Sequence, residues 1–284
     1  MKAVVLTCDK YMPFADHTIQ TYEKLWKNNY FTYRVPYNNN YPQSIKKKYG
    51  DKIEFIKTES PIKTTVLTLL QDLDDNEWIY WCMDDRYLVR IRDREAQEIY
   101  NLVKTTEDTQ ICSFLVIATE PYFHTDKFIK KDSKLFTKSG LVLYETVFSD
   151  GTKIRSAWRP QFVRVKIIRR MFESFPNYNF KAVEMNNFPK EKLEGEKFYV
   201  PEKNLVIVGE STHRGELTEN CASSFKKMGL EIPPNFTVTK KYMLQGKLPD
   251  KVAGLEFTLP VKMRKFITSV NRWYWRQKSI ESGA

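Results

Sequence analysis

The sequence predicts an α/β protein with a mixed, mostly parallel sheet flanked by helices. Short apolar runs and segments with helical spacing alternate over residues 1–118, which is the order expected of βαβ units. The 284 residues are 42% hydrophobic and 14% aromatic, with only 10 Gly and 13 Pro. This composition supports a substantial core in one large domain, or in one domain with a small extension.

Hydrophobic periodicity predicts the elements of the first half. Strands are expected at residues 2–7, 31–36, 52–57, 77–82 and 110–118, and helices at residues 16–28, 61–73 and 94–104. Ser60 is the predicted N-cap of the second helix, with Pro61 as its first residue. Asn and Pro residues predict a loop at residues 38–42.

The second half has a less regular pattern. A strand is expected at residues 141–148, a basic helix at 161–175, a short strand at 205–209 and a polar loop at 210–216. A boundary is expected near residue 246, so that residues 1–246 form the main domain and residues 247–284 a C-terminal extension. The main domain divides further into residues 1–118 and residues 119–246.

The net charge of +11 is concentrated near the C-terminus. Residues 226–284 carry 12 Lys or Arg and four Asp or Glu, a net charge of +8. Such a basic segment favours an anionic partner, either nucleic acid or the cytoplasmic face of a membrane.

The compartment is predicted to be the cytosol. The apolar stretch at the N-terminus is too short for a signal peptide, and no run reaches the length of a transmembrane helix. The four cysteines are far apart without metal-binding spacing, which is typical of reduced and mostly buried thiols.

The most informative stretch of the chain is the strand at residues 77–82 together with the residues directly after it. Its aromatic, apolar run is followed by Met83 and then by two adjacent carboxylates, Asp84 and Asp85. Unpaired charge is costly to bury, whereas hard divalent cations prefer oxygen ligands. Because ligands of open α/β sheets bind at the carboxyl ends of the strands, the pair predicts a site for a cation and a diphosphate. The alternative is a solvated turn in which an Asp pairs with Arg86.

The order of these motifs resembles GT-A glycosyltransferases, in particular bacterial capsule and lipopolysaccharide sugar transferases. A first strand, a Ser-Pro-x-Lys helix start at residues 60–63 and a strand ending in paired Asp carry the resemblance. It implies a Rossmann-like, nucleotide-sugar-binding half at residues 1–118 and an acceptor half at residues 119–246. Asp84 and Asp85 take the place of the family's Asp-x-Asp motif, which implies Mn²⁺ or Mg²⁺ as cofactor. Met83 replaces the first Asp, and Arg86 could supply positive charge instead.

The resemblance also implies residues that bind the donor. Thr7 and Asp9 end the first strand, where the family contacts the base and the ribose; an Asx turn is the alternative for Asp9. Lys63 lies in a first helical turn, where phosphates bind, and its alternative is a surface lysine. His213 and Arg214 precede a glycine in the late polar loop and could hold the departing diphosphate.

On the acceptor side, the resemblance implies a catalytic carboxylate and a stacking ring. Glu184 is the predicted general base that takes the proton of the acceptor hydroxyl, with Glu173 as a competitor. Trp158 is the candidate for stacking on a sugar, although a tryptophan packed on the core is the alternative.

The C-terminal extension predicts an amphipathic helix. At 100° per residue, its apolar and aromatic residues gather in one sector and its basic residues in the next. This pattern favours a helix in the interface of an anionic membrane, and a helix docked on the protein is the alternative.

The interpretation is a cytosolic, membrane-associated glycosyltransferase. It would move a sugar, with inversion, from a nucleotide sugar to a hydroxyl of a lipid-linked or cell-surface glycan, with no nucleic acid as partner. Two alternatives are a nucleic-acid-binding protein and an inactive glycan-binding homologue. A sugar nucleotidylyltransferase is disfavoured, because residues 7–13 contain no glycine to cradle a triphosphate.

Overall fold

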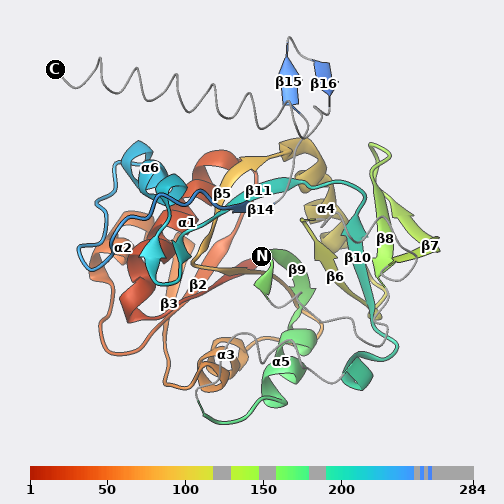
Figure 1. Ribbon diagram of the computed structural model, residues 1–284. Helices are drawn as coiled ribbons and strands as arrows, with labels where there is room; N and C mark the ends of the chain where they lie inside the picture. Colours follow the sequence, from red (N-terminus) through yellow and green to blue (C-terminus); the bar gives the residue numbers. More distant parts are fainter. Residues whose placement is uncertain (118–128, 147–157, 179–189, 246–249, 253–254, 258–284) are drawn as a thin grey trace. The chain divides into compact units, whose positions relative to one another are not determined.

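A computed structural model describes residues 1–117, 129–146, 158–178, 190–245, 250–252 and 255–257 (Figure 1). The chain divides into two compact units, Met1–Gly246 and Lys247–Ala284, and each is described by itself. In the second unit, two short strands, β15 (Asp250–Val252) and β16 (Leu255–Phe257), pair in antiparallel fashion. The predicted amphipathic helix of the extension lies outside the described residues.

The first unit is built on a nine-stranded sheet with the order β3-β2-β1-β4-β9-β6-β10-β8-β7. Its strands are β1 (Lys2–Leu6), β2 (Thr32–Tyr37), β3 (Ile53–Lys57), β4 (Trp78–Met83), β6 (Ile111–Leu115), β7 (Ile129–Phe136), β8 (Val142–Thr146), β9 (Gln161–Arg164) and β10 (Lys197–Pro201). The four strands from β3 to β4 are parallel. β9 runs antiparallel to β4 and β6, while β6 and β10 are parallel. The predicted α/β class, with a mixed and mostly parallel sheet flanked by helices, is confirmed.

Helices cover both faces of this sheet (Figure 1). They are α1 (Met12–Leu25), α2 (Gln43–Tyr49), α3 (Ile62–Leu70), α4 (Asp93–Thr105) and α5 (Val165–Glu173). A sixth helix, α6 (Glu219–Lys227), packs instead in a separate cluster with Phe14 of α1 and Tyr87. α1 and α4 share one hydrophobic core with the sheet, and α3 and α5 share another. No helix among the described residues is both long and apolar enough to cross a membrane.

The alternation of strand residues explains these two cores. In β4, Tyr80 and Cys82 face the α1 side, whereas Ile79, Trp81 and Met83 face the α3 side. Successive side chains of a strand point to opposite faces, and a strand buried on both faces is apolar throughout. The continuous apolar run of β4 is therefore what a central strand requires.

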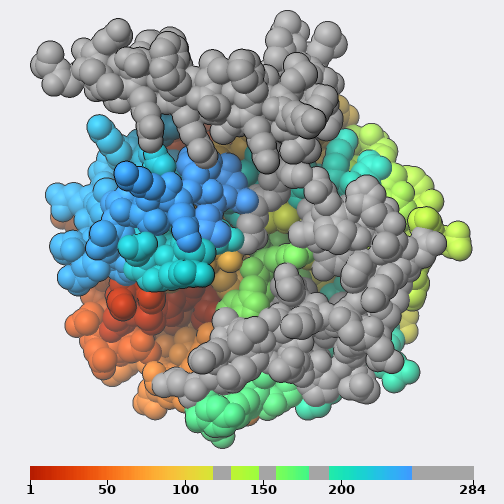
Figure 2. Space-filling model, viewed as in Figure 1, coloured from red at the N-terminus to blue at the C-terminus, as the bar shows by residue number. Residues whose placement is uncertain are grey.

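A second, smaller sheet continues the chain beyond β4. Its order is β14-β11-β5, formed by β5 (Arg86–Ile91), β11 (Val206–Glu210) and β14 (Leu244–Gln245), all antiparallel. In Figure 2, red and orange segments from the N-terminal part of the chain lie beside teal and blue segments from beyond about residue 200, so distant parts of the sequence are neighbours on this face. Only Asp84 and Asp85 separate β4 from β5, so the two carboxylates occupy the turn between the two sheets.

Two local predictions are wrong. Residues 161–175 are not one helix, because residues 161–164 form β9, which is buried between β4 and β6, and only then does α5 begin. Strand pairing with distant segments outweighs the local helical spacing there. Ser60 is not a helix cap: Pro61 occupies the N-cap position with an extended backbone, and α3 begins at Ile62.

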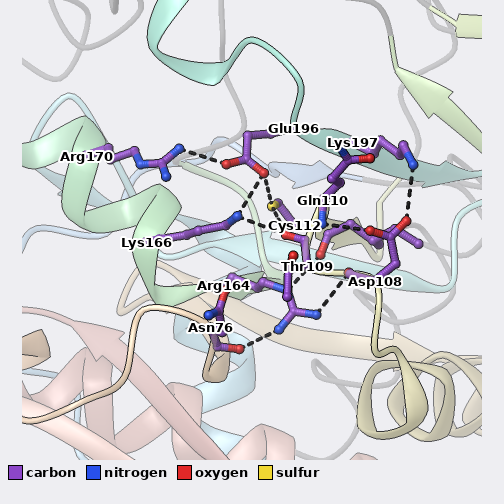
Figure 3. Close-up of polar contacts among 11 residues, drawn as sticks. Asn76, Asp108, Thr109, Gln110, Cys112, Arg164, Lys166, Arg170, Glu196 and Lys197 are labelled. Atoms are coloured by element: carbon purple, nitrogen blue, oxygen red, sulfur yellow. Dashed lines mark hydrogen bonds and ion pairs between the residues drawn. The ribbon is translucent and has the colours of Figure 1, made fainter.

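Arg164 ties the amino end of β4 to its neighbours (Figure 3). Its guanidinium donates to the backbone carbonyls of Ile111, Asn76, Thr106 and Asp108. It also lies over the ring of Trp78, 4.5 Å from the ring centroid. Since the side chain is buried, these contacts satisfy a charge that would otherwise be costly there.

Candidate active site

A cavity of about 560 Å³ opens at the carboxyl ends of β1 and β4. Its polar lining is formed by Thr7, Cys8, Asn38, Ser60, Thr65, Asp84, Asp85 and Arg86. Its apolar lining is formed by Leu6, Tyr11, Ile62, Met83 and Trp158. A concave site with a few polar groups on an apolar wall is typical of small-molecule binding.

Three hydrogen bonds hold Asp84 in place. Thr7 Oγ1 donates to the carboxylate at 2.6 Å. Thr18 Oγ1 of α1 donates to the Asp84 carbonyl at 2.7 Å, and the Asp84 amide donates to the Leu6 carbonyl at 3.1 Å. Asp84 is therefore a fixed group whose orientation depends on β1 and α1.

Asp85 is held differently, through charge. Its side chain is 35% exposed, and its Oδ2 lies 3.3 Å from Nη1 of Arg86. The same Nη1 lies 3.5 Å from Oε1 of Glu210, at the end of β11. Its backbone is fixed as well, because the Ser211 amide donates to the Asp85 carbonyl at 3.0 Å.

Burial makes both carboxylates costly to ionise. Burial raises the pKa of Asp84 to about 8, and the charge of Asp85 adds to the rise, while the Thr7 hydrogen bond opposes it. Burial also raises the pKa of Asp85, against the attraction of Arg86 and together with the repulsion of Glu210. An acidic pair of this kind favours a bound cation.

Two carboxylates fit part of a cation's ligand set. Among the described ranges of the chain, no three His, Cys, Asp or Glu side chains gather in a way that could hold a metal ion. Mg²⁺ in proteins is usually bound by one or two carboxylates together with substrate phosphates and water. The pair thus fits a divalent cation that shares its coordination with a diphosphate, and Mn²⁺ or Mg²⁺ stays a prediction.

Asp9 shapes the cavity rather than lining it. Its carboxylate accepts the backbone N–H groups of Asn38, Asn39 and Asn40 at 2.7, 2.8 and 3.0 Å. Burial would raise the pKa of Asp9, but these bonds outweigh it and lower the pKa. Asp9 thereby fixes the loop after β2, from which Asn38 reaches the cavity.

Five of the predicted site residues come together in the cavity lining: Thr7, Asp84, Asp85, Arg86 and Trp158. Their roles in binding stay predictions. Glu184, the predicted general base, lies outside the described residues.

Besides Asp9, three predicted residues do not line this cavity. Lys63 donates to the carbonyls of Glu173 and Phe175, at 2.8 and 2.7 Å, and so joins the start of α3 to the end of α5. His213 and Arg214 belong to a hairpin whose turn residue Arg214 has a φ of 52°. A role for these three in donor binding stays a prediction.

Sequence reasoning missed Tyr11, Asn38, Ser60 and Glu210 as parts of this region. Asn38 carried a usable signal, because it directly follows a predicted parallel strand, at the edge where ligands bind. Glu210 carried none, since only the pairing of β11 with β5 sets it opposite Arg86.

The sequence matches no protein-family model and no curated protein. Solved structures share parts of the architecture at low identity. A 4-diphosphocytidyl-2C-methyl-D-erythritol synthase is 10% identical with a TM-score of 0.43, over 80% of this chain and 98% of that chain. The galactosyltransferase LgtC, solved with donor and acceptor sugar analogs, is 12% identical with a TM-score of 0.38, over 87% and 86%. S. aureus TarS 1-349 is 12% identical with a TM-score of 0.43, over 72% and 59%. Similarities at this level assign neither an activity nor a substrate.

Proposed function

We propose that the chain is a glycosyltransferase that moves a sugar from a nucleotide sugar to a hydroxyl of a lipid-linked or cell-surface glycan. One observation carries the proposal: a cavity of about 560 Å³ at the carboxyl ends of β1 and β4 is lined both by Asp84, Asp85 and Arg86 and by Trp158 and Ile62. The charged groups suit a diphosphate with its cation, and the apolar groups suit a sugar or base ring.

The proposed reaction is a direct displacement with inversion. The acceptor oxygen forms a bond to the anomeric carbon, the bond from that carbon to the diphosphate oxygen breaks, and the nucleoside diphosphate leaves with the electron pair. The hydroxyl proton passes to a carboxylate, for which Glu184 is the proposed base. The guanidinium of Arg86 would stabilise the charge that develops on the leaving diphosphate. A bound Mn²⁺ or Mg²⁺ would add positive charge there.

The first test is a thermal-shift panel of UDP, GDP, CDP, dTDP and CMP, each with and without Mn²⁺. A ligand that binds only the folded protein raises its melting temperature. The nucleotide that binds then identifies the sugar donors for a product assay. Glycosyl transfer releases a nucleoside phosphate from the nucleotide sugar, whereas nucleotidyl transfer would release pyrophosphate from a nucleoside triphosphate. Nucleic-acid binding that falls steeply with salt, without any nucleotide effect, would contradict the proposal.

Asp85→Ala tests the site itself. We expect turnover to fall at least about 100-fold, because one of the two carboxylates proposed to hold the cation is lost. The melting temperature should stay within a few degrees of wild type, since Asp85 is 35% exposed and its removal relieves repulsion. Wild-type turnover in this variant would remove the assignment.

We also propose that residues 247–284 bind the inner face of an anionic membrane. Their basic and aromatic composition supports this. Flotation with vesicles of phosphatidylglycerol and phosphatidylcholine should recover the full chain, and neutral vesicles should recover much less. Equal recovery with both kinds of vesicle would contradict an electrostatic attachment.

A further inference from the structure

We infer that Glu210 is a positioning residue: it shares the Arg86 guanidinium with Asp85 and so keeps Asp85 available to the cation that accompanies a diphosphate. The inference rests on the proposed function, because it assumes that a cation binds at Asp85. Neither sequence pattern nor cavity lining points to Glu210.

The pairing of two strands sets Glu210 in place. Glu210 is the register partner of Arg86 in the antiparallel pair of β11 and β5. The next residue, Ser211, donates its amide to the Asp85 carbonyl at 3.0 Å. The backbone on both sides of Glu210 is therefore fixed against the Asp turn.

The Arg86 guanidinium lies at a similar distance from Asp85 and Glu210 and pairs closely with neither. Nη1 of Arg86 lies 3.3 Å from Oδ2 of Asp85 and 3.5 Å from Oε1 of Glu210. Both Nη1 and Nε of Arg86 are buried without a hydrogen-bond partner. Unsatisfied donors on a side chain that is only 16% exposed are costly. Without Glu210, we expect Arg86 to close onto Asp85 as a tight, charge-assisted pair.

Glu210 acts on the cation without being one of its ligands. Where the structure describes the chain, no three acidic, His or Cys side chains could hold a metal ion together. We infer that its influence on the cation passes mainly through the Arg86 guanidinium, which it shares with Asp85. If so, changing Glu210 should have little effect on Mn²⁺ binding once Arg86 is absent.

A double-mutant cycle measured by calorimetric titration of Mn²⁺ tests this consequence. We expect Glu210→Gln to weaken Mn²⁺ binding about tenfold, because Arg86 then competes for Asp85. Arg86→Met should bind Mn²⁺ more tightly than wild type. In the Arg86→Met background, Glu210→Gln should change the dissociation constant less than twofold. Glu210→Asp should restore part of the loss.

The pair of Arg94 and Glu98 on α4 is a matched control. Nε of Arg94 lies 3.6 Å from Oε1 of Glu98, which is 16% exposed, as Glu210 is. Glu98→Gln and Arg94→Met should leave Mn²⁺ binding unchanged. Circular dichroism and melting temperatures check that every variant is folded.

The outcomes separate the two hypotheses. Equal weakening by Glu210→Gln in both backgrounds would show simple charge loss and overturn the inference. A nucleotide that binds wild type when Mn²⁺ does not would also overturn it, yet would leave the proposed function standing. Failure of every nucleotide and of Mn²⁺ to bind would reject both.

Discussion

An arginine lies at each end of β4, Arg164 of β9 at the amino end and Arg86 of β5 at the carboxyl end, and the two are used in opposite ways. At the amino end, Arg164 donates to four backbone carbonyls and lies over Trp78. At the carboxyl end, Arg86 has two buried nitrogens without a hydrogen-bond partner and lies between two carboxylates. An arginine whose three nitrogens all donate to backbone carbonyls stabilises the fold. Arg86 instead lines the cavity, where its charge can act on a ligand.

The largest expected effect is the loss of stability on removing Arg164. We expect Arg164→Met to lower the free energy of unfolding by about 3–5 kcal/mol, because it leaves buried carbonyls without donors. Urea denaturation measures this change. Arg94→Met is the control, since Arg94 is 79% exposed, and it should cost little. If Arg164→Met were as stable as wild type but did not bind nucleotide, Arg164 would belong to the binding site and not to the support of the fold.

The second prediction concerns the loss of stability at low pH, which we expect to arise from a buried histidine, His17, and not from the acidic residues at the amino end of β4. His17 of α1 is fully buried, with Nε2 2.8 Å from Ser224 Oγ and its ring stacked on Phe225. Burial lowers the pKa of His17 to about 3, with a further contribution from Lys48. In the unfolded chain the pKa is about 6.5, so only the unfolded state takes up a proton between these values. The free energy of unfolding is therefore unaffected by His17 above about pH 6.5 and falls as the pH is lowered toward 3. At pH 5 the loss is about 2 kcal/mol.

The measurement compares urea denaturation at pH 7 and pH 5. The loss between these pH values should be about 2 kcal/mol smaller in His17→Asn than in wild type. His213→Asn, at a partly exposed histidine, is the control and should behave as wild type. At the amino end of β4, side-chain hydrogen bonds from Cys112, Lys166 and Arg170 outweigh burial and hold the pKa of Glu196 below its ordinary value, so Glu196 should keep its charge at pH 5 (Figure 3). Equal pH dependence in wild type and His17→Asn would contradict this prediction.

The local sequence was sufficient to predict the structure at the carboxyl end of β4. An apolar run of strand length followed by two acids predicted both the strand and the place of Asp84 and Asp85, because each signal lies within ten residues. The helix predicted at residues 16–28 exists as α1, but it spans Met12–Leu25.

Sequence was insufficient wherever distant segments decide the outcome. The residues of β9 have helical spacing, yet they pair with β4 and β6. α2 was missed, because neighbouring Asn and Pro residues predicted only a loop. Glu210 enters the site through strand pairing alone. Arg164 looked like one more cation of a basic helix, and only its burial reveals the four carbonyls that accept its hydrogen bonds.

The smallest expected effect comes from removing single hydrogen bonds, one that holds a site residue and one that only stabilises the fold. Thr7 Oγ1 donates to the Asp84 carboxylate at 2.6 Å, and Thr106 Oγ1 of the α4 C-terminus donates to the Leu102 carbonyl at 2.7 Å. We expect Thr7→Val and Thr106→Val each to lower the free energy of unfolding by about 1 kcal/mol, the net value of one hydrogen bond. Only Thr7→Val should also weaken Mn²⁺ binding, since it frees Asp84 to rotate away from the cavity. Calorimetry on both variants checks this, and equal Mn²⁺ affinity in the two would show that Asp84 needs no support from β1.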